Sequence, residues 1–157
     1  MLYRVMYIFV ACAFFASIAA ADEKMADHAK KLQGTWQAVE LEANGQKSPD
    51  DQVKALKIVF KDDEIFAVKP EGEDPKNKFK LDAAKTPKTI DVIPLEGSDK
   101  GKTAAGIYSL KKGRLTVCIN IFGKDPSVRP TEFKTKENDG VILVTLEREK
   151  SPPPPQK

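Results

Sequence analysis

Histidine and cysteine are almost missing from this sequence. It has one histidine, His28, and two cysteines, Cys12 and Cys118. Catalytic Ser-His and Cys-His pairs and multi-histidine metal sites therefore lack their base or their ligands, since His28 lies in a charged, alanine-rich stretch near the N-terminus. We predict no catalytic residue of these types, no metal site and no cofactor.

Clustered charge of one sign is also lacking. The 26 Lys and Arg residues nearly balance the 23 Asp and Glu residues, which gives a formal net charge of +3. The two signs are interspersed along the chain, whereas a protein that binds nucleic acid needs clustered basic charge. We therefore do not expect nucleic acid to be a partner.

Long hydrophobic runs occur only at the N-terminus, where 19 of the first 21 residues are apolar. Arg4 precedes an uninterrupted apolar run from Val5 to Phe15, and Ala19–Ala21 provides the small residues that a signal peptidase recognises. Residues 1–21 are therefore predicted to be a signal peptide that is cleaved before Asp22. The mature protein would be periplasmic or secreted, with no stable membrane insertion after cleavage.

Two other interpretations of this segment are weaker. An uncleaved membrane anchor is disfavoured because the apolar stretch of about 17 residues lies at the lower limit for spanning a bilayer. A lipid anchor on Cys12 is disfavoured because that residue comes too early and further apolar or small residues follow it. Loss of Cys12 leaves Cys118 without a disulfide partner, and its place between Val117 and Ile119 favours a buried apolar thiol over a nucleophile.

The rest of the chain divides into a central domain and two loose ends. Residues 22–31 are predicted to be a flexible arm with at most a short helical turn. Residues 151–157 contain four consecutive prolines and are predicted to be a disordered tail, although such a tail could also dock on an aromatic groove. Residues 32–150 form the predicted domain, in which about a third of the residues are apolar.

Within this domain, short alternating segments rich in β-branched and aromatic residues are separated by turn signals. One short helix is predicted over Pro49–Leu56, with Ser48 as its N-cap. The connections are too short for crossover helices, so neighbouring strands must pair antiparallel, and closure would remove exposed edges. We predict an all-β, antiparallel meander barrel of eight or nine strands. The strands are expected at 34–42, 57–61, 64–69, 78–81, 89–93, 103–110, 115–121, 131–135 and 141–148.

Side-chain alternation predicts which face of the 115–121 strand points inward. The four aliphatic residues Leu115, Val117, Ile119 and Ile121 share one face, and Thr116, Cys118 and Asn120 share the other. The aliphatic face is predicted to be the inside of the barrel.

The triplet Gly34-Thr35-Trp36 on the first strand, together with Arg148 at the end of the last strand, resembles the closing signature of lipocalin-like (calycin-type) barrels. In such barrels a tryptophan plugs one end and a late arginine packs over it. A guanidinium group stacks well on an indole ring, and its donors can reach terminal carbonyl groups. The resemblance therefore implies that Gly34, Trp36 and Arg148 close the barrel.

A longer series of segments, over about residues 31–148, resembles a family of small exported lipocalin-like domains that is abundant in planctomycete bacteria. The resemblance implies the fold and the export, but the family has no assigned biochemical activity, so function stays open. The segments are Leu32–Trp36, Pro87–Asp91, Gly101–Thr103, Gly106–Tyr108, Leu115–Cys118 and Arg129–Phe133.

Polar residues expected near one rim are the candidate ligand-binding residues: Tyr108, Asn120, Arg129 and Glu132. The hypothesis is a non-catalytic domain that binds a small amphipathic molecule or a protein partner. The seven aromatic residues that follow the signal peptide leave little material to line a wide cavity, so we expect a narrow interior. The alternative is a hydrolase or isomerase that uses carboxylates such as Asp91 and Glu132, and the fold alone does not decide between them.

Overall fold

The computed structural model describes residues 26–149, so the predicted signal peptide and the proline-rich tail lie outside the described residues. The strands are β1 (Gly34–Ala43), β2 (Gln46–Lys47), β3 (Lys57–Lys61), β4 (Glu64–Lys69), β5 (Gly72–Glu73), β6 (Asn77–Asp82), β7 (Lys88–Pro94), β8 (Ala104–Lys111), β9 (Arg114–Asn120) and β10 (Val141–Arg148). One short helix, α2 (Asp50–Ala55), lies between β2 and β3, and residues 26–32 are also helical.

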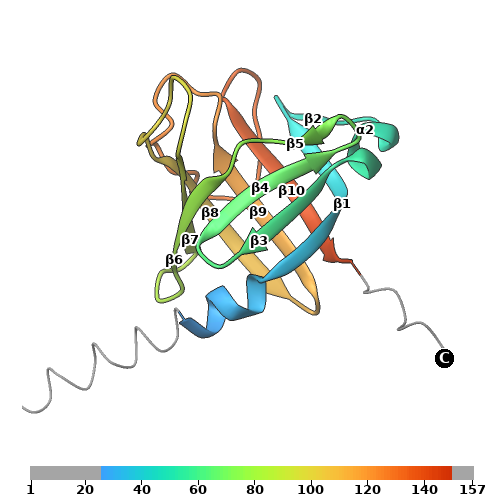
Figure 1. Cartoon of the computed structure of the whole chain (residues 1–157). Coiled ribbons are helices and arrows are strands. Elements are labelled where there is room, and N and C mark those ends of the chain that lie inside the picture. The colour runs from blue at the N-terminus through green and yellow to red at the C-terminus, as the bar shows by residue number, and fades with distance from the viewer. Residues whose placement is uncertain (1–25, 150–157) are drawn as a thin grey trace, which may run out of the picture.

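Eight of these strands form a closed antiparallel barrel (Figure 1). The hydrogen-bonded order is β10-β9-β8-β7-β6-β4-β3-β1, and β1 pairs with β10 to complete the ring. The short strands β2 and β5 extend β1 and β4 beyond the ring. The predicted all-β, lipocalin-like meander barrel is therefore confirmed, and the pairing of β1 with β10 removes the two edges that an open sheet of the described strands would have.

The predicted strand at 131–135 is wrong, because these residues do not pair with any strand in the described chain. β10 already pairs with β9 on one side and with β1 on the other, so no edge beside it is free. Residues 121–140, which we call the outer strap, instead connect β9 to β10 by running over the outer wall of the barrel.

The predicted inner face of β9 is confirmed for Leu115, Val117 and Ile119, which belong to the hydrophobic core. Ile121 follows the end of β9 and is partly exposed. The opposite face is buried as well, because the outer strap covers it. The Cys118 Sγ atom lies 3.5 Å from the carbonyl oxygen of Glu132 and 3.6 Å from that of Lys134.

The helical residues differ slightly from expectation. The helix predicted at 49–56 is α2, and its two acidic residues in the first turn and Lys54 in the last turn suit the helix dipole. The predicted N-cap is wrong, because Pro49 and not Ser48 caps the helix, without a side-chain hydrogen bond. Residues 26–32 form more helix than the single turn predicted there, and Leu32 at their end is fully buried. None of the helical segments in residues 26–149 is long and apolar enough to cross a membrane.

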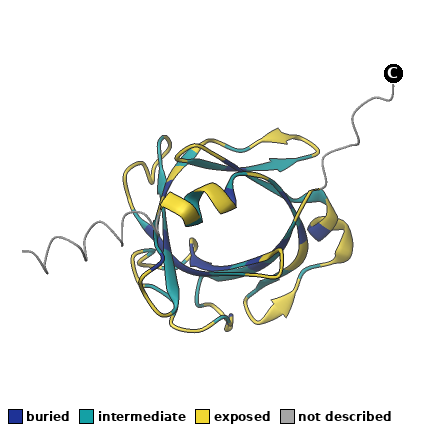
Figure 2. Ribbon diagram, turned by 90° about the horizontal axis from the view of Figure 1, so that it is seen from below, coloured by how far each residue is buried: buried dark blue, intermediate teal, exposed yellow. Residues whose placement is uncertain are grey.

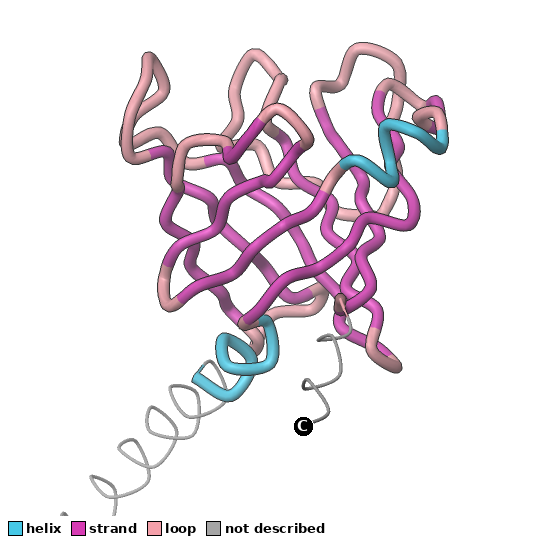
Figure 3. The backbone as a smooth tube through the Cα atoms, turned by 45° about the vertical axis from the view of Figure 1, so that its right-hand side comes forward, coloured by secondary structure: helices cyan, strands magenta, loops and turns pink. Residues whose placement is uncertain are grey.

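The two ends of the barrel carry different connections. Figure 2 shows the helix formed by residues 26–32 lying across one end of the ring, which we call the closed end. Figure 3 shows the long loops and α2 gathered at the opposite end, which we call the open end.

Candidate ligand-binding cavity

The closed end is built around Trp36, whose side chain is only 1% exposed. Its indole N–H donates a 2.7 Å hydrogen bond to the carbonyl oxygen of Leu32. The guanidinium carbon of Arg148 lies 4.4 Å from the centre of the Trp36 ring, and Arg148 donates hydrogen bonds to the carbonyl groups of Lys31 and Gln33. Arg148 therefore covers the tryptophan and ties the N-terminal helix to the last strand.

Gly34 makes room for this arrangement. Its φ of 109° disfavours any other residue, and a Cβ atom at this position would lie 3.0 Å from a terminal nitrogen of Arg148. The closing triplet therefore needs glycine for both its backbone conformation and the approach of Arg148.

Tyr108 also lies toward the closed end, buried in the core. Its hydroxyl group lies 3.1 Å from Nδ1 of His28. Burial raises the pKa of Tyr108 to about 12, with a smaller contribution from the negative charge of Asp82. The tyrosine thus stays neutral and packs against the N-terminal helix.

The middle of the barrel contains a cavity of about 200 Å³. Its wall is mainly aliphatic and comes from strands on opposite sides of the ring. An apolar cavity of roughly 150 Å³ is enough to hold benzene or xenon, whereas sites for drug-sized ligands start near 300 Å³. The lining residues are Ile58, Phe60, Ile65, Phe66, Ala67, Asp74, Asn77, Ile90, Val92, Val117, Ile119, Ile121, Ile142, Val144 and Leu146.

The two polar residues in this wall, Asp74 and Asn77, lie where the barrel is least well sealed. β4 pairs with β6 through Ile65 and the residue before it, and beyond that point β4 pairs with β5 instead. β9 and β10, in contrast, pair along their full lengths. The Asp74 side chain is 44% exposed, so the cavity reaches solvent at this seam between β4 and β6.

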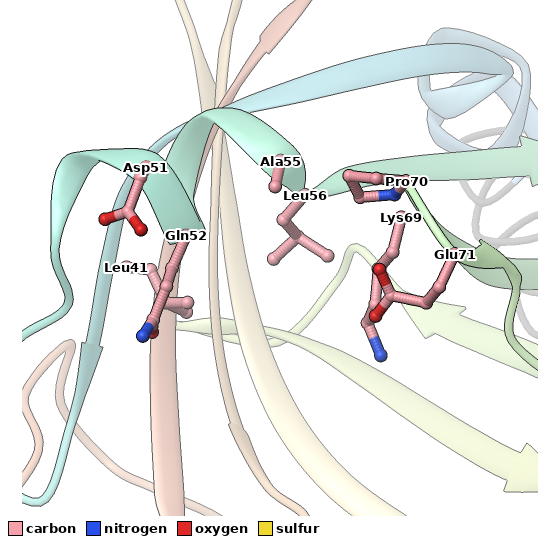
Figure 4. Close-up of a pocket in the computed structure, with 8 residues that line it drawn as sticks. All are labelled: Leu41, Asp51, Gln52, Ala55, Leu56, Lys69, Pro70 and Glu71. Atoms are coloured by element: carbon pink, nitrogen blue, oxygen red, sulfur yellow. The ribbon is translucent and has the colours of Figure 1, made fainter.

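A second hollow, of about 400 Å³, lies at the open end between α2 and the turn that follows β4 (Figure 4). Leu41 and Leu56 supply apolar surface that is continuous with the hydrophobic core. Lys69 lines this hollow and forms a 2.8 Å ion pair with Asp74, which lines the barrel cavity. The Lys69–Asp74 ion pair therefore lies between the hollow at the open end and the barrel cavity.

The four predicted ligand-binding residues are not brought together around either space. Tyr108 pairs with Val117, toward the β8–β9 turn, whereas Asn120 is the last residue of β9 at the opposite end. The Asn120 amide donates to the carbonyl groups of Asp125 and Val128 and accepts from the backbone N–H of Gly123. Asn120 thus organises the first half of the outer strap.

Arg129 and Glu132 lie in the strap itself. Arg129 donates hydrogen bonds to the carbonyl groups of Ile90 and Gly106, and its guanidinium forms a 2.7 Å ion pair with Asp91. Glu132 is paired with two lysines of the strap, at 3.4 and 3.8 Å. The two carboxylates considered for catalysis therefore have different cationic partners, and Arg129 fastens the strap to the wall.

The remaining titratable group of interest is the buried Cys118 thiol. Burial raises its pKa to about 11, so it is protonated at neutral pH and does not act as a thiolate. Within residues 26–149, no cluster of His, Cys, Asp and Glu side chains has the arrangement of a metal site.

Sequence reasoning did not select Ala67, Asp74 or Asn77, which line the cavity at the seam. The available signal was the pair of prolines, Pro70 and Pro75, which flank a short acidic stretch just before β6. Proline cannot donate to a strand ladder, so the two prolines mark the place where β4 and β6 separate.

Comparisons with known proteins identify no relative. No family model, no curated protein and no solved structure matches the chain.

Proposed function

We propose that this protein is an exported, non-catalytic barrel that binds one small, largely apolar molecule in its interior cavity. The observation that carries the proposal is the 200 Å³ space enclosed by aliphatic side chains from five strands of the ring. Water in an apolar space makes few hydrogen bonds, so an apolar molecule gains free energy by moving from water into it.

The size of the cavity sets both the size of the ligand and the affinity. A molecule of about ten non-hydrogen atoms or fewer fills it. The free energy available per atom for small ligands then gives a Kd on the order of 10 µM to 1 mM. The outer strap contains or contacts three of the predicted rim residues, Asn120, Arg129 and Glu132. Their predicted role in ligand binding stays a separate hypothesis.

Binding is tested by titrating the mature protein with hexan-1-ol in a calorimeter. Ala67 lines the cavity, so Ala67→Leu adds three carbon atoms inside it and should weaken binding at least about tenfold through steric exclusion. Ala84→Leu makes the same change at an exposed position and serves as the matched control. Equal binding by all three proteins, or no saturable binding to the unsubstituted protein, would refute the cavity as the ligand site.

Export rests on the pattern of residues 1–21. The proposal expects protein purified from its own cells to begin at Asp22 and to be recovered with the soluble envelope or secreted fraction. An intact mass that retains residues 1–21 would reject the signal peptide.

The non-catalytic part of the proposal has its own test. A panel of glycoside and ester substrates should give no turnover. Turnover that is lost in Glu132→Gln or Asp91→Asn, while the variant remains folded, would replace the binding function by an enzyme that uses carboxylates.

A further inference from the structure

The cavity opens to solvent at the β4–β6 seam, and we call this opening the cavity mouth. The polar groups at the mouth indicate which class of ligand the cavity can bind. Asn77 contributes a side-chain amide there, and both of its donors face the protein. Its Nδ2 atom donates to the carbonyl oxygens of Pro75, at 3.0 Å, and Ile65, at 3.4 Å. The donor capacity of this amide is therefore used in holding the seam.

The other atom of the same amide, Oδ1 of Asn77, receives no hydrogen bond from any residue of the described chain. No side-chain oxygen or nitrogen in residues 26–149 is both fully buried and without a partner, so this oxygen is accessible to solvent, and its residue lines the cavity. It offers a hydrogen-bond acceptor to whatever enters.

The second polar group at the mouth is also an acceptor. The Asp74 carboxylate accepts hydrogen bonds from the Lys69 ammonium group at 2.8 and 3.0 Å. Two carboxylate oxygens have about four lone-pair positions, so acceptor capacity is left over. The Asp74 backbone N–H is already bonded to the carbonyl oxygen of Ala67.

We infer that the ligand of this cavity has an apolar body and a single polar end that donates hydrogen bonds, an alcohol or an amine, and that carboxylates are rejected. This inference rests on the proposed binding function. The apolar body lies among the aliphatic side chains, and the donor lies at the seam between Asn77 Oδ1 and the Asp74 carboxylate. A carboxylate end places its acceptor oxygens against Asn77 Oδ1 and the Asp74 carboxylate, neither of which can donate a hydrogen bond to it.

Three probes with the same six-carbon body test the head group: hexan-1-ol, hexylamine and hexanoate, titrated into the mature protein at neutral pH. The alcohol and the protonated amine should bind. Hexanoate should bind at least about tenfold more weakly, because it gives no donor to Asn77 Oδ1 and is repelled by the Asp74 carboxylate. Hexanoate binding equal to or tighter than that of the alcohol overturns the inference.

Asp74→Asn separates the effect of charge from that of shape. It should improve hexanoate binding and weaken hexylamine binding, each by about threefold or more, and leave hexan-1-ol within about twofold. Asp99→Asn is the matched control, since Asp99 is likewise an aspartate paired with a lysine, Lys102, but does not line the cavity. If both variants shift the probes equally, general electrostatics explains the preference and the inference falls.

Asn77→Leu removes the free acceptor with little change in volume and should weaken hexan-1-ol binding by about threefold or more. Because this change also removes the two seam hydrogen bonds, its methyl NMR spectrum must first show an intact core. Different results would refute the proposed function itself. They are that none of the three probes binds saturably, or that the Ala67→Leu variant binds all three with unchanged affinity. If the three probes bind in the cavity with equal affinity whatever their head group, the inference is refuted but the proposed function is not.

Discussion

The closed end and the open end of this barrel are made from the same strands but use them differently. At the closed end, Trp36, Arg148 and Tyr108 fill the space, and their polar atoms reach the N-terminal helix. At the open end the strands separate at the β4–β6 seam, and the interior holds a cavity.

The difference shows how a protein with few aromatic residues can still close a barrel at one end. Trp36 and Tyr108 lie toward the closed end, where Arg148 stacked on Trp36 closes the ring, and the cavity in the middle of the barrel is lined mainly by aliphatic residues, with Phe60 and Phe66. We therefore expect stability to depend on the closed end, and ligand binding on the cavity in the middle of the barrel and its opening at the β4–β6 seam.

The largest expected effect is at the closed end. Trp36→Ala should lower the free energy of unfolding by about 3 to 5 kcal/mol, as truncation of a buried aromatic side chain does. Arg148→Ala should cost about 1 to 2 kcal/mol through loss of the stacking and of its hydrogen bonds to carbonyl groups, and should shift the emission of the single tryptophan. Urea unfolding followed by fluorescence and circular dichroism measures both. Unchanged stability and emission would show that these residues do not close the barrel.

The outer strap gives the next largest effect. Arg129→Ala leaves the carbonyl groups of Ile90 and Gly106 without this donor, and should cost about 2 to 3 kcal/mol. It should also loosen the strap over Cys118 and speed the reaction of this thiol with a disulfide reagent. Arg114→Ala, at an exposed ion pair, is the matched control and should change neither property. An unreactive Cys118 in Arg129→Ala would mean that other contacts hold the strap.

High pH should weaken the closed end through Tyr108. Burial raises the pKa of this tyrosine from 10.0 to about 12, so the unfolded chain loses the proton first as the pH rises. Stability should therefore be unaffected well below pH 10 and fall by about 1 to 2 kcal/mol between about pH 10 and 12.

Urea unfolding as a function of pH distinguishes this group from the thiol. Cys118, with a pKa raised from 9.0 to about 11, should act in the lower window, between about pH 9 and 11. Tyr108→Phe should remove only the upper part of the decline, and Cys118→Ala only the lower part. Identical pH profiles for all three proteins would contradict both assignments.

The smallest effect is expected at the rim of the open end. Lys69 and Asp74 form an ion pair in which both side chains are partly exposed, at 39% and 44%. Lys69→Met should change the free energy of unfolding by no more than about 0.5 kcal/mol, as is usual for such pairs. A loss of more than 2 kcal/mol in urea unfolding would show that the open end carries stability as well.

The strands were predictable because alternation and turn signals are local properties of the sequence. The outer strap was not predictable, because Thr131–Thr135 has the composition of a strand. The local sequence does not show that β10 already pairs with β9 on one side and with β1 on the other. Backbone carbonyl groups of the strap instead accept hydrogen bonds from the Cys118 thiol and the Ala105 N–H of the outer wall, and the Arg129 side chain donates to the Gly106 carbonyl.

Part of the candidate site was within reach of sequence reasoning. Tyr108 and Asn120 belong to one hairpin, and counting from its turn pairs Tyr108 with Val117, which places Asn120 farther along the barrel. The cavity was not predictable, because it depends on how side chains from strands distant in sequence leave space between them. That space is a property of packing, which a list of apolar positions does not contain.

Diffraction from crystals held under xenon pressure tests most directly the claim that the barrel is packed at one end and open to small apolar molecules in its interior. Xenon occupies dry apolar cavities of this size without any specific contact. We expect a xenon atom among Val117, Ile119 and Ile142, and no xenon beside Trp36. An interior without xenon, or xenon bound beside Trp36 instead, would contradict it.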